Sequence, residues 1–233
     1  MKTLKESILS STRTGKKAFL TLFPKDKYEL VKMIKTEIKE KGNNCSLNHI
    51  DTSEITNMAY LFSMDYHQDF SLNHFKGDIS KWDVSNVKTM AYMFANSEFN
   101  GDISEWDVSN VTDMSEMFRS SYFNGDISRW NVSNVKTMAY MFANSEFNSD
   151  ISKWNVSNVK YITGMFERAI FNRDISKWDI SKVNDMSYMF SQSKFNQDIS
   201  NWKINPYCDV KGMFRNCNIK DEYKPYQNGN QIK

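Results

Sequence analysis

All six tryptophans of this chain lie 24 residues apart. They are Trp82, Trp106, Trp130, Trp154, Trp178 and Trp202. A fixed period between 20 and 50 residues indicates a repeat protein, in which each unit buries its apolar side only by stacking on its neighbours. The sequence therefore predicts a tandem repeat that stacks into a solenoid.

Other apolar residues follow the same period. One column of phenylalanines begins at Phe94 and a second at Phe75, isoleucines recur from Ile79, and methionines recur from Met93. Equivalent side chains stacked rung upon rung build the core of a solenoid. We expect these columns, and the tryptophan column with them, to be internal; the alternative is an exposed aromatic ladder.

A single unit, residues 78–93, reads DISKWDVSNVKTMAYM. Its first half is rich in β-branched and aromatic residues, which predicts an extended segment with a corner or bulge. In the second half the apolar spacing changes to that of a helical turn or two, and irregular or 3₁₀ turns fit equally well. The predicted fold is an α/β or mainly β solenoid of about six to seven rungs.

Two polar columns share the period. Asp78, Asp102, Asp126, Asp150, Asp174 and Asp198 form the first. We expect each carboxylate to accept backbone N–H groups at a turn, the alternative being a row of calcium or substrate ligands. Asn100, Asn124, Asn148, Asn172 and Asn196 form the second, which we expect to be an internal amide ladder of the same kind.

Departures from the period divide the chain. Residues 1–43 are a basic segment in which Leu30, Val31, Ile34 and Ile38 form the apolar stripe of a capping helix that ends at Gly42. Residues 44–217 are the repeats, with a degenerate first rung and an insertion at 63–74. Residues 218–233 are a polar C-terminal cap or tail.

Charge and cysteine content restrict the function. Residues 1–42 carry 11 Lys and Arg against 5 Asp and Glu, whereas the remainder carries 19 against 23. With a net charge of only +2, nucleic acid is not expected as a partner. The sequence shows no signal peptide, lipid anchor or membrane span, and its three cysteines favour a reducing compartment. We therefore expect a cytoplasmic or virion-associated protein.

The repeats resemble a known family. Stretches such as FNGDISEWDVSNVTDMSEMF and FNGDISRWNVSNVKTMAYMF, within residues 44–217, are similar to the BspA-like repeats of mycoplasma-type surface lipoproteins and bacterial surface proteins. The resemblance implies a right-handed, leucine-rich-repeat-like stack and a role in binding or adhesion. The opening residues, MKTLKESILSSTRTGKK, are also similar to leaders of proteins from gut Bacteroidales and their phages.

The binding candidates are solvent-facing positions that vary between rungs. One column lies beside the tryptophans: Lys81, Glu105, Arg129, Lys153, Lys177 and Asn201. A second lies at the tips, where Tyr122 and Ile170 are the least polar members. These residues predict a non-enzymatic scaffold for a macromolecule, a protein or a glycan, with no cofactor. A structural part of a phage virion or cell envelope is the alternative.

A third hypothesis is an enzyme with its site in the first-rung insertion. His49, His67 and His74 all lie in or near that insertion, and Cys45 is close to it in the sequence. Their spacing matches no established metal-ligand pattern, and the chain has no phosphate loop, dinucleotide fingerprint or nucleophile elbow. We therefore predict no catalytic, cofactor-binding or metal site.

Overall fold

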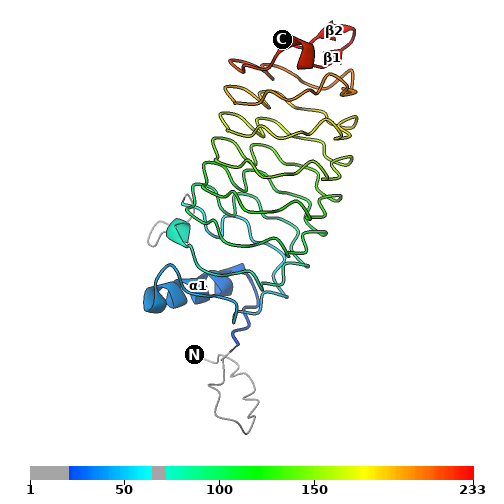
Figure 1. The fold of residues 1–233 in the computed structure, drawn as a ribbon. Coiled ribbons are helices and arrows are strands. Elements are labelled where there is room, and N and C mark those ends of the chain that lie inside the picture. Colours follow the sequence, from blue (N-terminus) through cyan, green and yellow to red (C-terminus); the bar gives the residue numbers. More distant parts are fainter. Residues whose placement is uncertain (1–20, 65–71) are drawn as a thin grey trace.

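The computed structural model describes residues 21–64 and 72–233. The chain winds into successive coils that lie one above another, from the N-terminal to the C-terminal end (Figure 1). The α-helix α1, Lys27–Lys41, lies at the N-terminal end. The remaining elements are the 3₁₀ helices η1, Leu72–His74, and η2, Asp221–Tyr223, and the antiparallel pair β1, Tyr226–Gln227, and β2, Asn230–Gln231.

Neighbouring coils are joined by parallel backbone pairing between equivalent repeat positions. Single bridges link Asn57, Thr89, Asp113, Thr137, Tyr161, Asp185 and Asp209 in that order. Beside the bridge at Asp113, the N–H groups of Met114 and Glu116 donate to the carbonyls of Thr137 and Ala139, at 3.1 and 2.8 Å. The period of the sequence is therefore the period of the backbone. We call residues 46–64 and 72–219 the repeat stack.

The first half of each repeat was expected to be extended with a corner or bulge, and in the structure it is interrupted by short turns. In one repeat the Asp126 side chain accepts the Ser128 N–H at 2.9 Å, and the Trp130 N–H donates to the Ile127 carbonyl at 3.2 Å. An aspartate that bonds the N–H two residues on closes the backbone into a turn. This turn is the predicted corner between the isoleucine and the tryptophan. Apart from the bridges between Leu22 and Ile50 and between Ser46 and Asp78, the bridges lie further along each repeat, and no strand forms in the first half of the described repeats.

The second half of each repeat is a run of turns. No α-helix occurs in the repeat stack as described. Positive φ angles recur there, as at Tyr140 (54°) and Asn144 (53°). In this backbone, successive N–H groups bond alternately within the repeat and to the next repeat. The N–H of Met141 donates to the Met138 carbonyl, and the N–H of Phe142 donates to the Met165 carbonyl. Of the two forms left open by the sequence, the structure has the irregular one.

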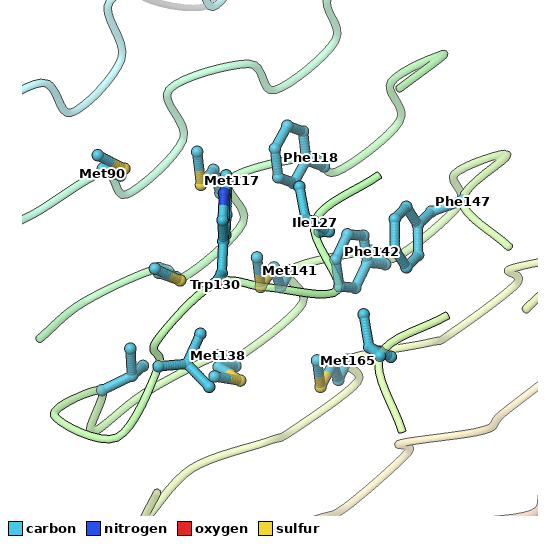
Figure 2. Packing of buried hydrophobic residues seen from close by; sticks show 14 of the residues in the cluster. Met90, Met117, Phe118, Ile127, Trp130, Met138, Met141, Phe142, Phe147 and Met165 are labelled. Carbon is cyan, nitrogen blue, oxygen red and sulfur yellow. The ribbon is translucent and has the colours of Figure 1, made fainter. Parts of the chain in front are cut away.

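The apolar columns form one continuous core. All six tryptophans are at most 4% exposed, and the residues of the two phenylalanine columns are buried. The rings of Phe118 and Phe142 stack in parallel at 5.7 Å, and Figure 2 shows Trp130, Met138 and Met141 gathered with them between the coils. The prediction of an internal aromatic register is confirmed.

Both ends of the stack are covered. Helix α1 begins at the N-cap Asp26, ends at Gly42 as predicted, and buries Leu30, Ile34 and Ile38. At the other end the Ile199 N–H donates to the Tyr223 carbonyl, and Ile232 is 7% exposed against the core. The polar C-terminal segment therefore folds back as a cap, because an open apolar rung would be exposed to water.

Candidate interaction surface

The turns place the same positions of every repeat at the solvent-exposed surface. We call Lys81, Glu105, Arg129, Lys153, Lys177 and Asn201 the ridge, and Glu98, Tyr122, Glu146, Ile170 and Lys194 the tip column. All six ridge residues are exposed. They follow the aspartate column by three positions, so the turn closed by each aspartate also directs the ridge side chain outward.

The ridge alternates in charge with the aspartates beside it. The Ser152 backbone N–H lowers the pKa of the Asp150 carboxyl, and the Lys153 ammonium adds to that effect. Asp174 is affected in the same way by Ser176 and then Lys177. Because each lysine has a carboxylate close by, the ridge is a surface of mixed charge rather than a basic patch.

The aspartate column itself is structural. All six carboxylates accept the N–H of the serine two residues on, at 2.8 to 3.0 Å. That bond lowers the pKa of each carboxyl. Among the described residues no group of three or more His, Cys, Asp or Glu is placed to hold a metal ion. The turn interpretation is confirmed.

The asparagine column is a ladder in which side chains accept backbone N–H groups, as predicted, but it lies at the surface. The Asn124 N–H donates to Asn100 Oδ1 at 2.9 Å, and the Asn148 N–H to Asn124 Oδ1 at 2.8 Å. Each amide therefore bonds the backbone of the next repeat instead of the next amide. Asn100 and Asn124 are exposed, so the expectation of an internal ladder was wrong.

The tip column carries two exposed apolar side chains. Tyr122 is 57% exposed and Ile170 46%. They stand two repeats apart with Glu146 between them. Glu98 Oε1 lies 2.9 Å from His74 Nδ1, and Glu98 Oε2 lies 2.8 Å from Lys76 Nζ. The carboxylate at the N-terminal end of the tip column is therefore already paired.

A further outward column was missed by sequence reasoning. Tyr92, Tyr140 and Tyr188 alternate there with Glu116, Gly164 and Gly212. The Tyr140 ring covers Gly164 so closely that a Cβ at that glycine would lie 2.2 Å from Tyr140 Cε1. From Tyr92 onward each tyrosine ring therefore lies over a glutamate or a glycine of the next repeat, whereas Tyr60 of the first rung stacks on Tyr92 at 4.5 Å. The recurrence of tyrosine every 48 residues was the available signal in the sequence.

The two histidines within the described residues, His49 and His74, lie at separate places. His49 Nε2 lies 3.1 Å from Glu37 Oε2, where α1 meets the first rung, and His74 pairs with Glu98. Burial raises the pKa of the Cys45 thiol, which disfavours the reactive thiolate. His67 lies outside the described residues. The surface hollow lined by Asn124, Asp150 and Arg173 is shallow and polar.

These features define a repeat protein whose varied surface lies outside an invariant core. The chain belongs to the family described as "Mycoplasma protein of unknown function, DUF285", whose model matches residues 29–146 and again residues 120–225. Searches of curated proteins and of solved structures gave no match. Within the described residues no helix is both long and apolar enough to cross a membrane.

Proposed function

We propose that this chain is a non-enzymatic repeat scaffold that binds a macromolecular partner, a protein in the first instance, along a right-handed, leucine-rich-repeat-like stack. The exposure of Tyr122 and Ile170 in one column carries the proposal. The apolar residues that recur in every repeat are used in the core, so an apolar side chain at a solvent-facing position serves no packing role there.

The spacing of these two residues suits a protein ligand. Neighbouring paired segments lie about 4.8 Å apart, so positions two repeats apart stand about 10 Å apart. Glu146 lies between them in the same column. Two apolar anchors around an acidic centre fit a partner segment with two apolar side chains and a basic residue between them, since tyrosine is favoured at binding hot spots.

The ridge contributes to the proposed partner binding in a secondary way. Its alternating charge favours a partner of mixed charge, and charged groups at the rim of an interface set association rate and orientation more than affinity. The BspA-like resemblance of the repeats supports adhesion or recognition as the broader role, with a glycan as another partner class. A structural role in a virion or envelope stays a prediction.

Site-specific photocrosslinking tests the proposal. A photoreactive phenylalanine analogue replaces Tyr122 in one variant and Tyr161 in another, and the whole chain is irradiated in cells. Tyr161 is a matched control because it is 49% exposed in a different column. We expect crosslinked protein partners from position 122 that are lost when Ile170→Ser is added.

Two results count against the tip column as a binding site. One is equal crosslinking from positions 122 and 161, which would indicate nonspecific contact. The other is no crosslinked product from either position in folded protein.

A further inference from the structure

Helix α1 presents different chemistry on its two faces. Its inner face buries Leu30, Ile34 and Ile38 against the N-terminal end of the repeat stack. Figure 1 shows the helix at that end, with the coils extending away from it. Among the described residues, the opposite face of α1 therefore forms the surface at the N-terminal end of the stack.

The outer face carries one tyrosine and three lysines in a line. Tyr28, Lys32, Lys35 and Lys39 stand at positions i, i+4, i+7 and i+11, which place them on one side of a helix. We call these four residues the outer stripe. It is about 16 Å long, given a rise of about 1.5 Å per residue. Tyr28 is 80% exposed, and Phe23, just before the helix, is 54% exposed.

Within the described residues, the lysines of the outer stripe have no ion-pair partner. None of the ion pairs between described residues involves Lys32, Lys35 or Lys39. The acidic residue nearest the helix centre, Glu37, is turned inward and held by Lys41 and His49. The stripe thus differs from the ridge, where lysines alternate with aspartates.

The remaining acidic groups of α1 lie to one side of the stripe. Glu29 accepts the Lys25 backbone N–H through Oε2 at 3.0 Å, and Glu40 lies one position beyond Lys39. Asp26 is engaged as the N-cap through the Glu29 N–H. By sequence, residues 1–20 add five Lys and Arg against one Glu to the same end of the chain.

The shape of this surface decides between two anionic partners. Proteins that bind single-stranded nucleic acid combine a basic groove with aromatic platforms, whereas the outer stripe is the convex side of a helix. A lipid surface needs no groove. Lysine stems lie along it while their ammonium groups reach the headgroups, and exposed aromatic rings insert at the interface.

We propose that the outer stripe of α1, together with Phe23, is a peripheral binding site for an anionic phospholipid bilayer. The helix then lies along the bilayer, and the repeat stack projects away from it with its ridge and tip column free. This site is separate from the tip column, so either proposal can fail without the other.

Vesicle cosedimentation of the full chain tests the site. The vesicles contain phosphatidylcholine alone or mixed with phosphatidylserine, at low salt. We expect binding only to the mixed vesicles. In the variant Lys32→Gln, Lys35→Gln, Lys39→Gln the partition coefficient should fall about 100-fold, because each lysine near an anionic surface contributes about fivefold.

A second triple variant has the same change in net charge. Lys88→Gln, Lys136→Gln, Lys160→Gln removes three lysines from the repeat stack and should bind as the wild type does. Thermal unfolding of both variants checks the fold. Equal loss of binding in the two variants, or retained binding in the α1 variant, overturns the proposal.

A fluorescence experiment reports directly whether the outer stripe inserts into the bilayer. The six native tryptophans are at most 4% exposed, so the variant Tyr28→Trp adds an indole that lipid can reach. Brominated phosphatidylserine vesicles should quench it, and unquenched fluorescence contradicts the proposed orientation. A single-stranded oligonucleotide that binds through the same lysines, with no vesicle binding, would assign the surface to nucleic acid instead.

Discussion

The indole Nε1 of Trp130 donates a hydrogen bond of 3.1 Å to the carbonyl oxygen of Ile103, in the preceding repeat. The same bond recurs for Trp106, Trp154, Trp178 and Trp202, each to an isoleucine 27 residues earlier. The Ile103 carbonyl also accepts the backbone N–H of Trp106 at 3.2 Å, so each of these tryptophans fills the core and adds a second donor to a carbonyl of the preceding repeat. This double role accounts for their regular recurrence.

Replacing Trp130 by Phe should lower the free energy of unfolding by about 0.5–1.5 kcal/mol, because the Ile103 carbonyl loses one of its two donors and keeps the Trp106 N–H, while an aromatic ring remains. Trp130→Ala should cost about 3–5 kcal/mol, since a cavity is added. Urea denaturation followed by far-ultraviolet circular dichroism measures both. A Phe variant as stable as the wild type would show that the hydrogen bond contributes nothing net.

Gly164→Ala should destabilise the protein by about 2 kcal/mol or more, because the residue has φ of 56° and the new Cβ meets the Tyr140 ring at 2.2 Å. Gly229→Ala is the matched control: φ there is 79°, and a Cβ would meet nothing within 4 Å. It should show the backbone cost alone. Tyr140→Ser should recover part of the loss in the Gly164 variant, and additive effects of the two changes would contradict the contact.

Stability should fall as the pH drops below about 4. The aspartate column has lowered pKa values in the folded state, chiefly through the serine N–H bonds. The stabilisation is therefore present above the unfolded pKa of about 3.9 and is lost as the pH falls through the folded value. Urea midpoints measured from neutral to acid pH test this.

Asp150→Asn should reduce that acid sensitivity with little change at neutral pH. An amide oxygen can accept the same bond, as Asn131 Oδ1 does from the Ser133 N–H at 3.2 Å. Asp150→Ala should instead lower the urea midpoint at neutral pH as well. Identical acid profiles for the wild type and the Asn variant would exclude Asp150 from the effect.

The Cys208 thiol should resist alkylation in the folded protein. Burial raises its pKa to about 11, so the reactive thiolate is scarce at neutral or mildly basic pH. Iodoacetamide labelling of the variant Cys45→Ser, Cys217→Ser, read by mass spectrometry, should proceed in urea and be slow without it. Equal rates in the two conditions would contradict the burial of Cys208.

Much of the fold was predictable from the sequence, because it depends on repetition. The period, the internal columns from Phe94 and Met93, and the helix ending at Gly42 all follow from spacing and from capping chemistry. The path of each repeat was less predictable. Around Ile127 and Trp130, β-branched and aromatic residues favour an extended segment, but the Asp126 side chain closes a turn there. That competition between side chain and backbone is decided by local hydrogen bonds, which composition does not reveal.

The candidate surface, too, was predictable from the sequence only in part. The sequence alone predicted that the ridge and the tips of Tyr122 and Ile170 face the solvent, since these positions vary while the columns around them stay constant. It did not show that Lys153 lies close enough to Asp150 to lower the pKa of that carboxyl, or that Tyr140 covers Gly164.

By itself the sequence determined the register of this protein, because a period of 24 can be buried only by stacking equivalent side chains on one another. Only the tertiary structure decided what each repeat does with its polar groups. The tryptophan N–H, the asparagine amide and the tyrosine ring all find their partners in a neighbouring repeat. Such contacts depend on the distance between coils, which no single repeat specifies.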